Sequence, residues 1–237
     1  MLKPKLSYSF GKSLLTKPFE LIKYELNKPF VPSPVMDRGS RFEYVLQYGM
    51  RDLVLYTETA TRGVKFNNFA RDTAIVNELY MDHPYLICTQ AEYDAAQVFC
   101  DSISYRVQSI VTGSTFQDHF EFEEDDVISH GYTDFLSDYC IYDLKISDPA
   151  PEAFSKQVVN FKWHLQAYMY TKALERPFCW IVIGPEAPHV CRIYECNDRF
   201  LKSGERLFNE AKVLFKEFNL DQPQEIAREL HAPAWLK

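Results

Sequence analysis

Residues 131–147 read GYTDFLSDYCIYDLKIS, and this stretch is the most informative part of the chain about its fold. It contains two β-rich segments joined by a short turn, so paired neighbouring strands would bring Asp134 close to Asp143. Side chains two apart on a strand point to the same face of the sheet, which places Asp143 and Lys145 together and turns Leu144 into the core. The stretch therefore predicts two carboxylates and an ammonium group converging at a sheet edge.

The sequence around this stretch predicts one α/β domain over residues 1–237, with a mainly helical part at 1–112 and the core at 113–237. Apolar spacing predicts helices within 1–28, 37–48, 66–80, 90–112, 154–174 and 198–218. Residues 50–62 are strand-like or irregular. Strand patterns occupy 116–126, 127–137, 139–147, 177–184 and 189–196, the first three as an antiparallel meander. We expect a central mixed sheet of about five strands flanked by helices.

The net charge of −7 argues against a general nucleic-acid-coating protein, because phosphate binding depends on Lys and Arg. The charge is unevenly distributed, however. Residues 1–28 hold six lysines against two glutamates, a net of +4 that leaves −11 for the remainder. An acidic total is compatible with a DNA enzyme if carboxylates hold metal ions while basic residues line one channel.

No apolar run approaches the roughly 20 residues that a membrane-spanning helix needs. The N-terminal residues contain lysines but no apolar stretch of signal-peptide length. The six cysteines include no C-x-x-C pair and are expected to be reduced thiols. These features predict a cytoplasmic protein without a membrane partner.

The spacing Asp-x8-Asp-x-Lys supplies what metal-dependent phosphodiester hydrolysis needs. Hard oxygen ligands hold Mg²⁺, with Mn²⁺ as a substitute, and a second ion can stabilise the leaving oxygen. A neighbouring lysine can orient or deprotonate the attacking water, or stabilise developing negative charge. The pattern alone is common by chance, and a surface Asp–Lys pair on a hairpin is the alternative.

Three further features favour the functional interpretation. Gly131 precedes the first aspartate, and a glycine inside a strand pattern indicates a bulge or a close backbone approach. Gln166 and Tyr170, four residues apart, share one face of the helix that follows the Asp-Leu-Lys segment. Glu43 lies on an upstream helix, directly after Gly-Ser-Arg-Phe at 39–42.

The order of these motifs resembles the PD-(D/E)xK exonucleases, and within them the RecE (exonuclease VIII)-type domain of phages and prophages. The motifs are Gly-Ser-x-Phe-Glu at 39–43, Gly-x-x-Asp at 131–134, Asp-Leu-Lys at 143–145 and Gln-x-x-x-Tyr at 166–170. The opening LSYSFGKSLLTKP, the later PSPVMDRGSRFEYVL and the closing APAWLK also resemble that family. The resemblance thus covers nearly the whole chain and implies a PD-(D/E)xK nuclease core.

The resemblance implies a role for each matching residue. Asp134 and Asp143 would bind metal, with help from the Leu144 backbone carbonyl, and Lys145 would be the catalytic lysine. Gln166 would fix that lysine or the nucleophilic water.

Two further positions follow from the same resemblance. Tyr170 would support the site or touch phosphate. Glu43 stands where most relatives have a histidine, and its carboxylate is expected to bind metal as well. Some relatives hold an iron–sulfur cluster with a cysteine before the first motif; no cysteine precedes Glu43, so we expect no such cluster.

The implied activity is Mg²⁺-dependent 5′→3′ degradation of double-stranded DNA ends, which leaves a 3′ single-stranded tail for recombination in a bacterium or a phage-infected host. The family also implies a ring-like trimer or tetramer and a partner single-strand annealing protein. Two alternatives stay open. One is a structure-specific or restriction-like endonuclease, and the other is a DNA-end or protein-binding module with a decayed catalytic centre.

Five residues are candidates for contact with DNA. Ser9 could cap the first helix, and with Lys12 and Ser13 it could form an anion site at the helix start, suited to a terminal phosphate. Arg38 and Arg41, near Glu43 in sequence, are rival candidates. Ordinary capping and surface charge are the alternative for all five.

Overall fold

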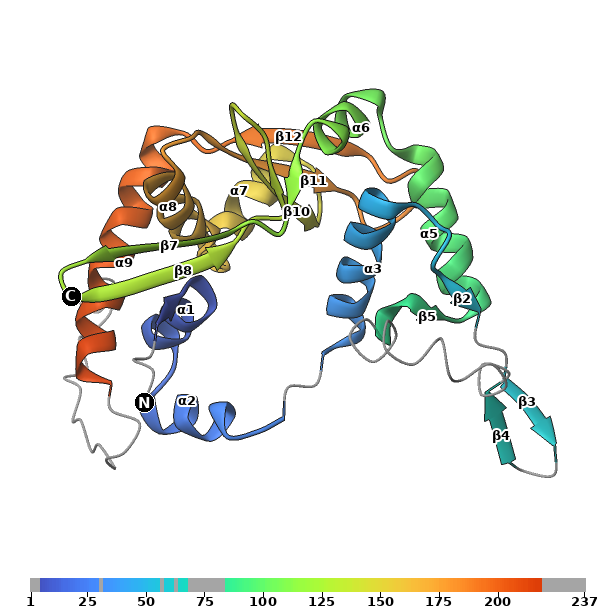
Figure 1. The fold of residues 1–237 in the computed structure, drawn as a ribbon, viewed down its shortest axis with the longest axis horizontal. Helices are drawn as coiled ribbons and strands as arrows, with labels where there is room; N and C mark the ends of the chain where they lie inside the picture. The colour runs from blue at the N-terminus through green and yellow to red at the C-terminus, as the bar shows by residue number, and fades with distance from the viewer. Residues whose placement is uncertain (1–4, 30–31, 56–57, 62–63, 68–83, 219–237) are drawn as a thin grey trace, which may run out of the picture.

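The computed structural model describes residues 5–29, 32–55, 58–61, 64–67 and 84–218 (Figure 1). The ribbon forms an arch, with α1 (Tyr8–Thr16), α2 (Phe19–Leu26) and α9 (Asp198–Glu217) in one limb and α3 (Pro34–Tyr48) and α5 (Gln90–Ser102) in the other. None of the helices in these ranges is long and apolar enough to cross a bilayer.

A five-stranded mixed sheet spans the top of the arch in the order β12-β11-β10-β9-β6. Its strands are β6 (Thr115–Phe116), β9 (Phe135–Leu136), β10 (Ile141–Ile146), β11 (Phe178–Ile183) and β12 (Cys191–Glu195). β10 and β11 are parallel, joined by a crossover through α7 (Pro151–Asn160) and α8 (Trp163–Leu174), and the other pairs are antiparallel. The expected α/β fold with a mixed sheet is confirmed.

The expected three-stranded meander is only partly correct. β7 (His119–Glu124) and β8 (Val127–Tyr132) form an antiparallel hairpin, whose two-residue turn places Asp125 and Asp126 at positive φ. β1 (Leu6–Ser7) adds to β8 in parallel, so this hairpin belongs to a separate three-stranded sheet. β10 pairs instead with β9 and β11, because the chain bends after β8 and starts a new, short strand.

Three expected helices are each broken in two. The helix expected within 1–28 is divided into α1 and α2 by Pro18, which is the N-cap of α2. The helix expected at 154–174 is divided into α7 and α8 by Lys162, which adopts a left-handed conformation. Ser104 caps α6 (Tyr105–Thr112) by accepting from the Val107 backbone N–H, which separates it from α5. The cap of α1 is Ser7 rather than the expected Ser9, because pairing with β8 holds Ser7 extended.

The remaining elements follow the expected pattern with small differences. α3 ends at Gly49, whose φ is 77°, and α9 and the β11–β12 pair lie where the pattern places them. The sequence predicts a helix at 66–80, but residues 66 and 67 belong to the strand β4 (Val64–Asn67). The rest of that segment lies outside the described residues. The short elements between α3 and α5 are β2 (Val54–Leu55), β3 (Glu58–Thr61), a 3₁₀ turn (Pro84–Leu86) and β5 (Ile87–Cys88).

Two apolar clusters cover opposite faces of the five-stranded sheet. Along β11, Phe178, Trp180 and Val182 point to one, and Ile181 and Ile183 to the other, as strand alternation requires. The first, here the α8-side cluster, includes Leu6, Leu14, Phe120, Ile141, Phe154, Leu165, Met169, Phe178, Trp180, Val182 and Phe208. The second, the α3-side cluster, includes Phe42, Val45, Leu86, Phe99, Val107, Phe135, Ile181 and Ile183.

Candidate active site

The β9–β10 hairpin brings the two aspartates together. Its register pairs Leu136 with Ile141 and Phe135 with Tyr142, so Asp134 comes next, opposite Asp143. Asp134 itself lies in a bend just before β9 rather than in a strand. The expected approach of the two side chains is therefore confirmed, although only one of them lies on a strand.

The shortness of β9 is what opens the sheet at this point. β9 covers β10 only at Ile141 and Tyr142, so β10 has no β9 partner from Asp143 onward. The Leu144 backbone N–H instead donates to Asp134 Oδ2 at 2.7 Å. A carboxylate thus takes the place of a strand carbonyl, which satisfies the backbone donor and fixes the side chain.

Asp143, Lys145 and Gln166 form a connected polar group on the α8 face of β10. Gln166 Nε2 donates to Asp143 Oδ1 at 2.7 Å, and Lys145 Nζ lies 3.4 Å from Gln166 Oε1. Lys145 Nζ also lies 2.5 Å from Asp143 Oδ2, a charge contact without hydrogen-bond alignment, so this buried oxygen keeps its accepting capacity. The glutamine amide can satisfy both neighbours because its two ends differ in polarity.

Trp163 forms the floor beneath the lysine. Lys145 Nζ lies 5.2 Å from the centroid of the indole ring, within cation–π range. Trp163 in turn packs against Phe154 and stacks on Phe161. The left-handed Lys162 sets this arrangement, since it turns the chain so that α8 begins at Trp163.

Glu43 approaches the aspartates from α3, on the other limb of the arch. Its Oε1 accepts from Gln117 Nε2 at 2.6 Å and from Gln47 Nε2 at 3.3 Å. Gln117 lies between β6 and β7 with a left-handed φ of 54°, so a sharp turn presents this amide to Glu43.

The three carboxyl groups influence one another. Burial raises the pKa of Asp134 well above its ordinary value, and the charges of Asp143 and Glu43 raise it further. Burial also raises the pKa of Glu43, and the charge of Asp143 raises it further. The hydrogen bond from Gln117 acts in the opposite direction and lowers it. A divalent cation would relieve this repulsion.

The donor chemistry fits a hard divalent cation. In the described ranges no three His, Cys, Asp or Glu side chains lie close enough together to hold a metal ion by themselves. Mg²⁺ needs fewer, because it usually keeps several waters and takes one or two carboxylates plus substrate phosphate. Asp134 and Asp143, with the Leu144 carbonyl directly after Asp143 in sequence, offer such oxygens, and Glu43 lies near enough to act on both carboxylates electrostatically.

Tyr170 supports the site from beneath. Its hydroxyl donates to the Tyr132 carbonyl at 2.9 Å, two residues before Asp134. The close approach expected at Gly131 is confirmed: a Cβ atom there would lie 2.7 Å from Phe120 Cζ and 3.1 Å from Tyr170 Cε1. Glycine lets the ring pack directly on the β8 backbone.

The predicted anion site at the start of α1 is divided. Ser9 and Ser13 line a pocket between α1 and α2. Lys12 lies elsewhere, with its Nζ 5.6 Å from the centroid of the Phe161 ring. Burial lowers the pKa of Lys12, and the positive charges of Lys145, Lys17 and Lys162 lower it further, so of the three residues Lys12 is the one near Lys145.

The two arginines differ in their surroundings. Arg41 is only 3% exposed, and its guanidinium bonds to the Tyr85 carbonyl at 2.7 Å and to Glu92 at 3.1 Å. The Arg41 side chain is thus directed into the protein, which disfavours the predicted contact with DNA. Arg38 is half-buried and lies 3.9 Å from Glu186, so it stays accessible.

Sequence reasoning missed Tyr8 as well as the two glutamines that hold Glu43. The Tyr8 hydroxyl donates to the Phe161 carbonyl at 2.7 Å. Burial raises the pKa of Tyr8, and the charges of Asp143 and Tyr170 add to the effect, which places this phenol beside the acidic group. Its contacts lie far away in sequence, so no local pattern marks it.

Comparison with known proteins gives support at the level of the fold. No family model matches the chain, and no curated protein matches it. Among solved structures, a crystal structure of a candidate exonuclease from Eubacterium rectale aligns with 97% of this chain and 90% of its own at a TM-score of 0.66 and 13% identity. The structure of SSO0001 aligns at a TM-score of 0.32, too low to support an argument. The chain therefore shares the α/β fold of the Eubacterium rectale protein.

Proposed function

We propose that this protein is a metal-dependent DNA exonuclease. The observation that carries the proposal is the group formed by Asp134, Asp143, Lys145 and Gln166, built at the point where β9 leaves β10 uncovered. Two coupled carboxylates beside a lysine form a chemical arrangement suited to phosphodiester hydrolysis. The candidate exonuclease with the same fold is consistent with this function.

Asp134 and Asp143 would hold Mg²⁺ or Mn²⁺, in one or two ions, with the Leu144 carbonyl and Glu43 completing the donor set. When bound, the metal supplies positive charge that polarises the scissile phosphoryl group. Lys145 is held between Asp143 and Gln166, so its ammonium is directed rather than free to rotate. In the reaction it orients the attacking water and stabilises negative charge that develops on the phosphate.

Lys12 and Lys162 extend the positive charge away from Lys145 along the α1 side of the site. They are suited to hold the DNA backbone next to the scissile phosphate. Arg38 is a further backbone contact on the α3 limb. Ser9 and Ser13 face their own pocket and have at most an indirect role in holding DNA.

The finer features of the activity rest on the resemblance to RecE-type domains. These are 5′→3′ polarity on double-stranded ends, a 3′ tail for recombination, a trimeric or tetrameric ring and a single-strand annealing partner. A ring is compatible with the net charge of −7, because its outer surface can be negative while lysines line the central hole that faces the DNA.

The test is digestion of linear and closed-circular duplex DNA with Mg²⁺, using separate labels at the 5′ and 3′ ends. We expect linear DNA to be degraded from its 5′ ends while circles survive. Asp143→Asn keeps the shape of the side chain but should abolish cleavage. Cutting of circles would establish an endonuclease instead, and no cutting with either Mg²⁺ or Mn²⁺ would mean that the site binds DNA without hydrolysing it.

A further inference from the structure

A polar pocket opens directly beside Glu43 on the α3 limb. Its volume is about 510 Å³, and its lining is made of three tyrosines, two glutamines, a serine and the glutamate. These residues are Ser40, Glu43, Tyr44, Gln47, Tyr48, Tyr85 and Gln117. Glu43 therefore faces both the aspartates and this pocket.

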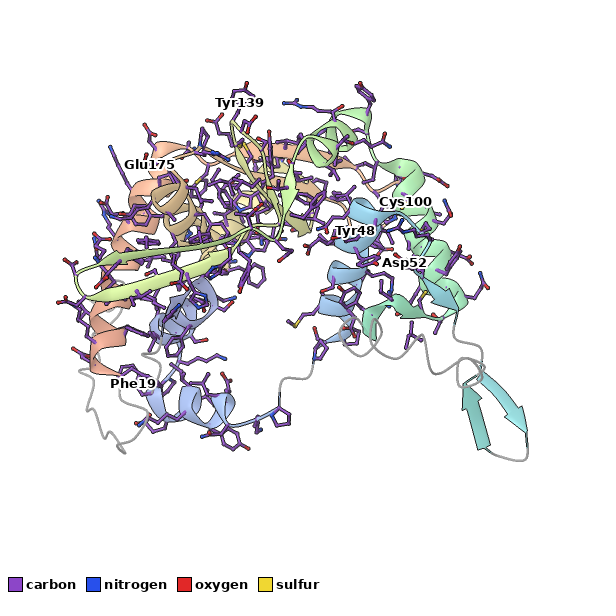
Figure 2. All side chains as sticks on the ribbon, in the orientation of Figure 1. Phe19, Tyr48, Asp52, Cys100, Tyr139 and Glu175 are labelled. Carbon is purple, nitrogen blue, oxygen red and sulfur yellow. The ribbon has the colours of Figure 1, made fainter. Side chains whose placement is uncertain are left out.

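The tyrosines give the pocket aromatic walls. The rings of Tyr44 and Tyr48 have centroids 4.7 Å apart, and Tyr85 lies 6.4 Å from Tyr44. The Tyr44 hydroxyl donates to Asp52 at 2.8 Å, which fixes that ring. Figure 2 shows Tyr48 at the end of α3 nearest the sheet, where its ring lies 6.3 Å from Phe116 of β6. Tyr48 is 45% exposed, so a ligand can reach its face.

The polar groups of the pocket are amides that can both donate and accept. Gln47 and Gln117 direct their Nε2 groups to Glu43, and nothing in the described part of the chain donates to their carbonyl oxygens. Amides of this kind match the mixed donor and acceptor edge of a nucleobase. A phosphate group is disfavoured here, because the pocket contains a carboxylate and no cation among its described lining residues.

We propose that this pocket binds one unpaired nucleobase of the DNA strand being degraded. The inference rests on the proposed function, since Glu43 links the pocket to the hydrolytic group. A base stacked on Tyr48 would belong to a nucleotide next to the scissile phosphate, so the strand end unpairs before it is cut. Aromatic stacking accepts every base, which suits an enzyme that must degrade any sequence.

The experiment measures binding without added metal, so that DNA stays intact. Fluorescence anisotropy compares an intact duplex with duplexes that carry one abasic nucleotide at successive positions from each strand end. At one position we expect the missing base to weaken wild-type binding about ten-fold, within the range of one base–aromatic stack. Tyr48→Ala should bind both duplexes equally and weakly. Tyr48→Phe keeps the stacking face and should keep the preference.

The matched control is Tyr105→Ala, which removes a tyrosine that is 84% exposed on α6 and outside the pocket. It should behave as wild type. A wild type indifferent to abasic nucleotides at every position, or a preference that survives in Tyr48→Ala, would overturn the proposal. If instead a free deoxynucleoside monophosphate competes at micromolar concentration while abasic DNA binds normally, the pocket holds the product and not the strand.

This design separates the two proposals. If the protein prefers DNA with an intact base but cuts no DNA, the proposed base-binding pocket is supported and the proposed exonuclease activity is contradicted. If the protein cuts DNA normally but shows no base preference, the exonuclease activity is supported and the base-binding pocket is contradicted.

Discussion

The two sides of the five-stranded sheet contribute differently to the site. The α8 side supplies Asp143, Lys145 and Gln166, linked to one another and resting on Trp163 and buried rings. The α3 side supplies Glu43 alone, held by two glutamines next to an open pocket. Under the proposed function this difference is a division of roles, in which the closely packed side would position the reacting groups and the more open side would receive the substrate.

The comparison is tested most strongly by Lys145→Ala. Loss of the ammonium should lower the single-turnover cleavage rate by about 10²–10⁴-fold, the range for a positioned proton-transfer or charge-stabilising group. Lys156→Ala, at an exposed position on α7, is the matched control and should keep the wild-type rate. A rate for Lys145→Ala within three-fold of the control would remove the lysine from the mechanism.

The α3 side is tested by Glu43→Gln. The amide oxygen can still accept from Gln117 and Gln47, so the fold should persist while the charge is lost. We expect the Mg²⁺ concentration at half-maximal rate to rise by about ten-fold or more. A variant with a lower maximal rate but unchanged Mg²⁺ dependence would show that Glu43 acts on the substrate and not on the metal.

Two glycines sharpen the contrast in packing. A Cβ at Gly204 of α9 would overlap the His164 carbonyl oxygen of α8, whereas a Cβ at Gly39 of α3 would meet nothing within 4 Å. Gly204→Ala should therefore lower the free energy of unfolding by about 2 kcal/mol, because the helices must separate. Gly39→Ala should raise it by about 0.5 kcal/mol through helix propensity. Urea unfolding measures both, and equal effects would contradict the contrast.

The smallest expected effect concerns Asp134 in metal-free protein. Its raised pKa means that ionisation destabilises the folded state, so stability is fully present at low pH and is lost as pH rises through the folded-state pKa. At neutral pH Asp134→Asn should thus have a higher melting temperature than wild type, by a few degrees in a thermal unfolding scan. Its amide oxygen can still accept from Leu144.

Mg²⁺ provides the control for this prediction. It should raise the melting temperature of wild type and have a smaller effect on Asp134→Asn, since binding to the folded state stabilises by mass action. A variant less stable than wild type in the absence of metal would indicate that the carboxylate has a favourable partner in the folded protein.

Much of the β10–α8–β11 region could be predicted, because its signals are local. Alternation places Asp143 and Lys145 on one face, and helical spacing places Gln166 and Tyr170 beneath them. The helix breaks were harder. Pro18 and Ser104 are recognisable stop or cap signals, but Lys162 adopts a left-handed conformation without glycine or asparagine.

The rest of the site depends on contacts between distant residues. Gln117 meets Glu43 across 74 positions, and Arg41 is removed from the surface by Glu92, 51 positions away. The pairing of β1 with β8, which displaced the expected cap from Ser9 to Ser7, is likewise long-range. Periodicity carries no information on such pairings, so these residues could be placed only once the chain was folded.

The parallel pairing of β1 with β8 also sets an order of events during synthesis. Leu6 has its partner at Ser129, and the Tyr8 hydroxyl meets the Phe161 carbonyl across 153 positions. β1 and α1 therefore cannot dock until the segment 129–161 has been synthesised, because Ser129 and Phe161 are their partners there. Until those partners have been synthesised, a nascent chain lacks the Tyr8 hydroxyl beside Asp143, so this side of the candidate site is the last to be completed.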